Sequence, residues 1–177
     1  MRLFVAAELP DTLSEALAET SARLRGCVRG RFVGTDSFHV TLAFLGSVRA
    51  SCVNDLAGLV VEASQGHSPF STTLAELGIF GHPSSGILWQ GFDEGRDEWA
   101  DLAADVRASL RGGGYAIDEQ GFIPHVTLMR QADVAYGALP MPCVGRGEIR
   151  TVTLFESDLS GERPRYEALE RVELRAW

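Results

Sequence analysis

The chain has 177 residues and a net charge of −8, from 24 acidic residues and 16 basic ones, all of them Arg. Hydrophobic residues make up 45% and charged residues 23%, which are globular proportions that exclude disordered and collagen-like classes. No apolar run reaches the roughly 20 residues of a membrane span. The acidic balance disfavours a protein that coats long nucleic acid by bulk charge, although Arg can still grip one phosphate in a local pocket.

Local patterns predict an alternation of strands and helices without a linker or low-complexity stretch. Helices are expected to begin near Asp11, Ser51 and Asp97, each with apolar residues on one face, and Gly112–Gly114 ends the last of them. Strands are predicted, in chain order, at residues 2–8, 31–33, 38–45, 70–80, 87–92, 123–129, 151–159 and 166–174.

The N-terminal apolar stretch is too short for the hydrophobic region of a signal peptide and ends at Glu8, so we expect a cytoplasmic protein. Cys27, Cys52 and Cys143 are odd in number and widely spaced. Because they form no Cys-x-x-Cys pair, the sequence predicts reduced thiols and neither a zinc knuckle nor a redox motif.

The tetrapeptide His-Val-Thr-Leu occurs twice, at residues 39–42 and 125–128. A predicted strand and an amphipathic helix precede each copy. The spacing from strand to His is also similar, 35 residues from Phe4 to His39 and 37 from Leu88 to His125. The repeat therefore predicts an internal duplication that gives two pseudo-symmetric lobes.

Each copy of the repeat places one imidazole and one hydroxyl on the same face of a strand, because residues i and i+2 of a strand point the same way. His39 and Thr41 share one face and His125 and Thr127 another. The opposite faces are apolar and are expected to belong to the core; they carry Phe38, Val40, Leu42 and Phe44 in the first strand, and Pro124, Val126 and Leu128 in the second.

If the lobes face each other, two His and two Thr side chains surround one point. A neutral imidazole can take a proton from water, a protonated one can give a proton to a leaving oxygen, and hydroxyls can bind phosphate oxygens. The set therefore suits hydrolysis of a phosphodiester. Two other interpretations stay open: half-buried His on amphipathic strands with Thr present for its strand propensity, and a metal site, for which no Cys, Asp or Glu stands at recognisable spacing.

The chain resembles the two-histidine (2H) phosphoesterase superfamily, and within it the RNA 2′,3′-cyclic phosphodiesterases, also called 2′-5′ RNA ligase-like proteins. The resemblance spans nearly the whole chain. Its residues are Arg2–Pro10, Phe38–Gly46, Pro124–Arg130, Leu154–Ser157 and Tyr166–Leu169. This family often carries Pro-Arg before the strand at 87, where Ser85-Gly86 stand in this chain.

The resemblance implies an α+β fold in one bilobal domain over residues 1–177, with two antiparallel sheets lining a cleft and helices outside. It implies metal-independent hydrolysis of RNA 2′,3′-cyclic phosphate ends to 2′-phosphates, without a cofactor. His39 would be the proton donor and His125 the acceptor, and Thr41 and Thr127 would hold the phosphate. RNA ends are the expected partner, no membrane association is expected, and we expect a monomer.

Arg130 follows the second motif and is a weaker candidate for binding phosphate. Strict alternation puts it on the inner face unless the strand ends or bulges first. Phe44 and Trp89 are expected in the core rather than against a base. Two other functions stay open: a nucleotide-binding module with little turnover, and ligation of RNA ends, which shares its transition state with hydrolysis.

Overall fold

A computed structural model describes residues 1–135, 137–161 and 163–175. The strands, α-helices and short 3-10 helices (η) follow one another along the chain in an alternating order. They are β1 (Arg2–Glu8), α1 (Asp11–Leu24), β2 (Arg29–Phe32), η1 (Thr35–Ser37), β3 (His39–Ser47), η2 (Ala50–Cys52), α2 (Val53–Gln65), β4 (Phe70–Phe80), β5 (Gly86–Phe92), α3 (Arg96–Gly112), β6 (His125–Asp133), β7 (Arg146–Ile149), β8 (Thr151–Asp158) and β9 (Arg165–Glu173).

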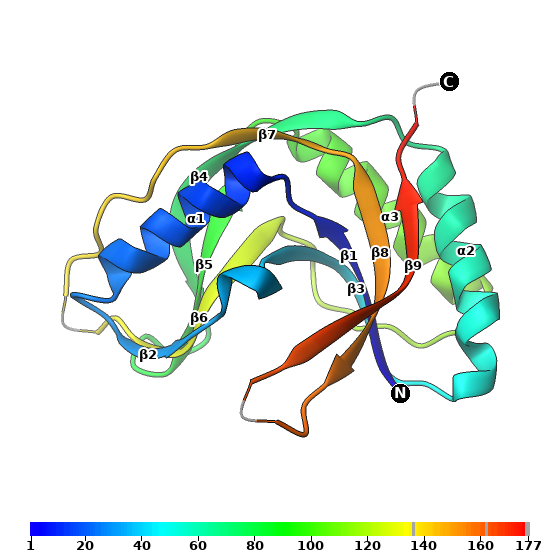
Figure 1. Cartoon of the computed structure of the whole chain (residues 1–177), viewed down its shortest axis with the longest axis horizontal. Coiled ribbons are helices and arrows are strands. Elements are labelled where there is room, and N and C mark those ends of the chain that lie inside the picture. The colour runs from blue at the N-terminus through cyan, green and yellow to red at the C-terminus, as the bar shows by residue number, and fades with distance from the viewer. Residues whose placement is uncertain (136, 162, 176–177) are drawn as a thin grey trace.

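The strands form two antiparallel sheets, one of order β3-β1-β8-β9 and one of order β2-β6-β5-β4-β7 (Figure 1). We call β3 and β6, which begin at His39 and His125, the motif strands. Each pairs with the strand that comes before the preceding helix of its repeat: β3 pairs with β1, which precedes α1, and β6 pairs with β5, which precedes α3. The expected α+β architecture with two antiparallel sheets is therefore confirmed, and the strand, helix and motif-strand order is repeated as the duplication predicts.

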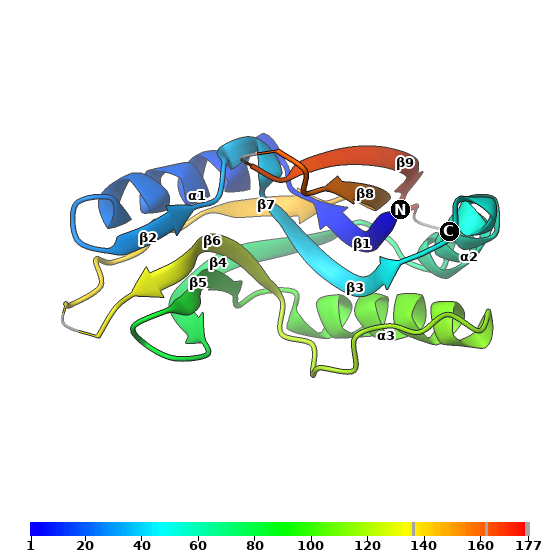
Figure 2. The same ribbon diagram turned by 90° about the horizontal axis from the view of Figure 1, so that it is seen from below.

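The helices lie outside the sheets, and two of them cross to the sheet of the other motif (Figure 2). Helix α1 follows β1 but packs against β7, where Gly147 lets Leu13 approach the backbone closely. Helix α3 follows β5 but packs against β3 and α2. Each motif strand is thus held by elements from both halves of the sequence, and the buried side chains form one hydrophobic core.

Helix α3 is anchored in this core by Trp99, which is fully buried. Its ring meets Phe70 edge-on at a centroid distance of 5.0 Å and Phe92 at 5.3 Å. Its indole N–H donates to the Thr72 hydroxyl at 3.1 Å, so the buried polar atom is satisfied. Burying a side chain of this size contributes roughly 2–3 kcal/mol, which makes Trp99 a major anchor of α3.

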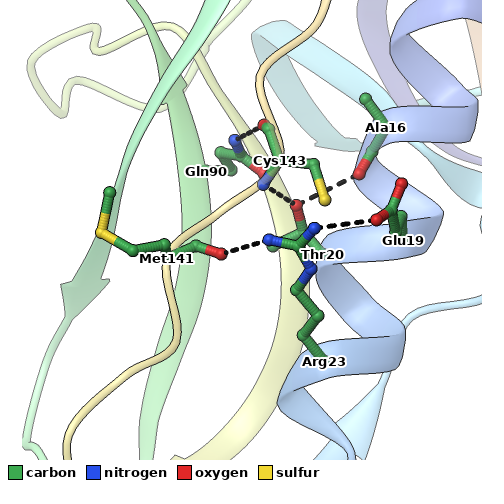
Figure 3. Close-up of polar contacts among 7 residues, drawn as sticks. All are labelled: Ala16, Glu19, Thr20, Arg23, Gln90, Met141 and Cys143. Atoms are coloured by element: carbon green, nitrogen blue, oxygen red, sulfur yellow. Dashed lines mark hydrogen bonds and ion pairs between the residues drawn. The ribbon is translucent and has the colours of Figure 1, made fainter.

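The segment before β7 is fastened between α1 and the second sheet (Figure 3). The amide of Cys143 donates to the Thr20 hydroxyl at 2.9 Å, and the buried Gln90 amide donates to the Cys143 carbonyl at 3.0 Å. Arg23 donates to the carbonyl of Met141 at 3.0 Å. These contacts position the segment that leads into β7, and β7 pairs with residues 70–73 of β4.

Some elements differ from the sequence-based predictions. Strand β7 was not predicted, because Arg146-Gly147-Glu148-Ile149 contains one apolar residue and no alternation. Strand β2 lies at residues 29–32 rather than 31–33, and a 3-10 turn precedes α2. Strand β6 begins at His125 rather than at residue 123 and continues to Asp133. Within the described residues, no helix is long and apolar enough to span a membrane.

Candidate active site

The two motif strands lie next to each other and border a small cavity of about 40 Å³. His39 and Thr41 reach it from β3, and His125 and Thr127 reach it from β6. The rest of the cavity lining consists of Arg130, Val33, Ser37 and Tyr166. The structure therefore brings together all five site residues that the sequence singled out.

A β-bulge in each motif strand determines which later residues face this cavity. Opposite β1 the register passes over Leu42, and opposite β5 it passes over Leu128. Leu42 and Ala43 are consequently both buried, as are Leu128 and Met129. Alternation is thereby reversed beyond each bulge.

The structure corrects the predictions for Phe44 and Trp89 and decides the position of Arg130. Phe44 was expected in the core, but it lies half-buried on the same face as His39 and Thr41. Arg130, the matching residue of β6, lies on the face of His125 and Thr127, where strict alternation would not have placed it. Trp89 was also expected in the core, but its half-buried ring lies 5.8 Å from that of His125, centroid to centroid.

Both imidazoles are held by the same kind of backbone hydrogen bond. Nδ1 of His39 lies 2.8 Å from the carbonyl oxygen of Ser37, and Nδ1 of His125 lies 2.7 Å from that of Ile123. A carbonyl oxygen can only accept, so each Nδ1 carries a proton and Nε2 of the neutral ring is the acceptor. In this tautomer, Nε2 of His39 accepts from the Thr41 hydroxyl at 3.1 Å.

Aromatic rings pack against both imidazoles. His39 meets Tyr166 edge-on at 5.3 Å and Phe4 at 5.0 Å, measured between ring centroids. His125 meets Phe80 edge-on at 4.9 Å. These contacts fix the ring planes and remove much of the water that would otherwise solvate an imidazolium.

Desolvation lowers the pKa of both imidazoles. Burial is the main cause of lowering the pKa of His39 to about 4, and the positive charges of Arg130 and His125 lower it further. Burial is likewise the main cause of lowering the pKa of His125, again with Arg130 acting in the same direction. The free site therefore favours two neutral imidazoles near neutral pH, beside an Arg that has no ion-pair partner among the described residues.

Arg107, which sequence reasoning did not single out, connects the two motif strands from α3. Its Nε donates to the carbonyl of Leu42, the bulge residue of β3, at 2.8 Å. Its Nη1 donates at 2.9 Å to the carbonyl of Gln120, in the loop that leads to His125. The amide of Asp118 in the same loop donates to the Phe44 carbonyl at 3.0 Å. Arg107 thus helps to set the position of one motif relative to the other.

Tyr166 was also not chosen as a site residue, although it borders the cavity and contacts His39. Tyr166 lies on β9, where it pairs with Ser157 of β8. It comes near His39 of β3 because β8 and β9 belong to the same sheet as β1 and β3. Within residues 1–135, 137–161 and 163–175, no three His, Cys, Asp or Glu side chains are grouped so that they could hold a metal ion.

Two sheets that each contribute one His-x-Thr strand to a shared cavity define the two-histidine phosphoesterase class. The chain belongs to the 2′-5′ RNA ligase superfamily, whose sequence model matches residues 13–138. The family expected from the sequence is thereby confirmed.

Curated relatives and a solved structure agree with this membership. An RNA 2′,3′-cyclic phosphodiesterase of Escherichia coli K12 is 31% identical over 170 residues, covering 96% of this chain and 94% of the relative. One of Geobacillus stearothermophilus is 31% identical over 130 residues, or 72% of this chain, which spans 41% of that longer relative. The structure of E. coli LigT complexed with 3′-AMP has a TM-score of 0.83 and 29% identity, and the match covers 98% of this chain and 97% of that one.

Proposed function

We propose that the protein hydrolyses 2′,3′-cyclic phosphate ends of RNA to 2′-phosphates, with His39 and His125 as general acid and general base and without a metal ion. The observation that carries the proposal is the convergence of both imidazoles, two hydroxyls and the Arg130 guanidinium on one cavity. The names of the curated relatives support this class of enzyme. The 3′-AMP complex of LigT supports a nucleotide as the ligand of this fold.

In the proposed reaction, His125 takes a proton from a water molecule whose oxygen attacks phosphorus. The bond between phosphorus and the 3′ oxygen breaks, and His39 gives a proton to that oxygen as it leaves. The products are a 2′-phosphate and a 3′ hydroxyl, with the proton now on His125 instead of His39. Transfer of one proton between the rings through solvent restores the starting state.

The hydrogen bond between His39 and Thr41 gives the acid step a structural logic. When His39 is neutral, the Thr41 hydroxyl donates its proton to Nε2 and cannot donate it to another acceptor. When a bound phosphate raises the pKa of His39 so that Nε2 becomes protonated, Nε2 no longer accepts from the Thr41 hydroxyl, and its own proton can be given to the leaving 3′ oxygen. The hydroxyl proton of Thr41 is then released to bind a non-bridging phosphate oxygen, so substrate binding and acid formation favour each other.

A second candidate function, ligation of RNA ends, is favoured by the name of the superfamily alone. Ligation runs the same displacement with a 5′ hydroxyl in place of water. Water is present at far higher concentration, so hydrolysis prevails unless the second RNA end is bound beside the cavity. A binding module with little turnover is the third possibility, in which a bound nucleotide is released unchanged.

Phosphorus NMR of a 2′,3′-cyclic mononucleotide, incubated with the protein and excess chelator, tests the proposal directly. We expect the cyclic phosphate signal to be replaced by that of a 2′-phosphate at a rate that the chelator does not change. A 3′-phosphate product would contradict the assigned leaving oxygen. Activity that chelator abolishes and one divalent ion restores would make His39 and His125 metal ligands instead.

Replacing Thr41 or Thr127 by Val should weaken catalysis while the fold is retained, because Val keeps the branched shape and removes only the hydroxyl. A hydrogen bond to a charged group contributes about 1.5–3 kcal/mol, so kcat/KM should fall on the order of 10- to 100-fold in each variant. Steady-state kinetics with a cyclic mononucleotide measures this, and circular dichroism checks folding. If both variants keep wild-type kcat/KM, the hydroxyls do not bind the phosphate.

The rate should follow a bell-shaped pH profile because one imidazole must be charged while the other is neutral. In the free enzyme the pKa of both is lowered from 6.5, so the alkaline limb of kcat/KM should lie below pH 6.5. The negative phosphate raises the pKa of the acid in the complex, so the alkaline limb of kcat should lie at higher pH. Coincident alkaline limbs for kcat and kcat/KM would contradict this electrostatic account.

A further inference from the structure

Two larger hollows open on either side of His39 and Tyr166, and they differ in charge. We name the first the basic hollow; it measures about 330 Å³, and its lining includes Arg2, Phe4, His39, Phe44, Arg130 and Tyr166. The second is the acidic hollow, of about 570 Å³, whose charged lining is Glu8, Asp11, Glu15, Asp36 and Arg171. A substrate centred between the two imidazoles can extend its remaining atoms over either one.

The basic hollow has features that single-stranded nucleic acid requires. Among the residues that the structure describes, Arg2 and Arg130 line this hollow, no carboxylate lines it, and neither Arg forms an ion pair. The guanidinium of Arg2 lies 4.8 Å from the centre of the Phe44 ring, which orients the charge over the hollow's aromatic lining. Positive charge beside aromatic rings is the combination that binds a phosphate backbone and its bases.

The acidic hollow has the opposite character. Four carboxylates line it against one cation, and that cation, Arg171, is already paired with Glu8 at 2.7 Å. A phosphodiester placed there would be repelled by Asp11, Glu15 and Asp36, because like charges at short range destabilise each other. The two hollows therefore present an RNA chain with one favourable and one unfavourable route away from the cavity.

We propose that the RNA chain on the 5′ side of the cyclic phosphate lies over the basic hollow and that Arg2 binds the phosphate joining the terminal nucleotide to its 5′ neighbour. This inference rests on the proposed function, because it takes the cyclic phosphate to occupy the cavity between His39 and His125. It assigns the enzyme to oligonucleotide substrates, since a cyclic mononucleotide lacks the phosphate that Arg2 would bind.

The test compares a 2′,3′-cyclic mononucleotide with the dinucleotide that ends in the same cyclic phosphate. In the Arg2→Gln variant, the ratio of dinucleotide KM to mononucleotide KM should rise about fivefold, the size of a contact made by an exposed charge. The dependence of log KM for the dinucleotide on log salt should become shallower by about 0.7, the value for one phosphate contact to a single strand. Arg29→Gln, an equal charge change in β2 outside both hollows, should leave both quantities at wild-type values.

Two results would overturn the inference while leaving the proposed function intact. One is an unchanged KM ratio and salt dependence in Arg2→Gln, with wild-type enzyme hydrolysing both substrates. The other is a change of the KM ratio in Glu15→Gln with none in Arg2→Gln, which would place the chain over the acidic hollow. Failure of the wild-type enzyme to hydrolyse either substrate would refute the proposed function itself and this inference with it.

Discussion

His39→Ala and His125→Ala are each expected to lower kcat by at least about 100-fold, the usual contribution of a general acid or base. Both side chains face the cavity, and each is held by one backbone carbonyl and by aromatic contacts. Losing such ring contacts costs about 1 kcal/mol, which corresponds to roughly 2–4 °C in Tm for a chain of this size. The variants should therefore fold but hardly turn over.

Turnover of a 2′,3′-cyclic mononucleotide and thermal unfolding of the same samples test this expectation. His82→Ala is the matched control, because His82 is exposed in the loop between β4 and β5 and borders neither the cavity nor the basic or acidic hollow. It should keep wild-type kcat. If either cavity variant keeps a rate within a few-fold of wild type while folded, the paired-imidazole mechanism is wrong.

The double variant adds a separate check on the pairing. If the two imidazoles act on one transition state, the combined loss in His39→Ala/His125→Ala should be much smaller than the product of the single losses, because each single variant already disables the concerted step. Independent roles in separate steps would give losses that multiply. Single-turnover rates of the three variants decide between these outcomes.

The catalytic candidates could be predicted from the sequence because they depend only on local geometry. A period of two along a strand places His39 with Thr41 and His125 with Thr127, whatever the rest of the chain does. The repeat supplied the further expectation that two such strands meet. The contact between β3 and β6, and the cavity that both strands border, agree with that expectation.

The strand faces on which Phe44 and Arg130 lie were harder to predict because they depend on a bulge in each strand. A bulge is a property of the register between two strands, and the residues passed over, Leu42 and Leu128, look like ordinary inward-facing residues in the sequence. A signal was nevertheless present: two consecutive apolar residues, Leu42-Ala43 and Leu128-Met129, follow the Thr in both copies. Because an apolar pair stands at the same position in both copies, the sequence favours a bulge at this position in both strands.

The remaining site features come from long-range packing and left little trace in the sequence. Tyr166 reaches His39 because β9 and β8 extend the sheet of β1 and β3. Arg107 reaches both motifs only because α3 crosses to the other sheet. Strand β7 forms because the contacts of Thr20 and Gln90 with Cys143 bring a weakly patterned segment beside β4. None of these follows from composition or periodicity.

Arg130→Gln is expected to lower kcat/KM by about 100-fold, because a guanidinium is the natural donor to a phosphate whose negative charge must be held during displacement. Arg130 borders both the cavity and the basic hollow. Its charge also lowers the pKa of His39 and of His125, so its removal should raise both. The alkaline limb of kcat/KM should consequently move to higher pH in the variant, although burial, the larger cause, keeps the pKa of both imidazoles below 6.5.

Steady-state rates measured across pH 4 to 8 separate the two effects of Arg130. Arg130→Lys keeps the charge but loses the planar fork, so it should keep the wild-type pH profile while recovering only part of the rate. Arg29→Gln, an equal charge change elsewhere on the second sheet, should alter neither. An unshifted profile in Arg130→Gln would mean that the guanidinium lies too far from the imidazoles to influence them. A full recovery of rate in Arg130→Lys would show that charge alone, and not the paired donors of the guanidinium, binds the phosphate.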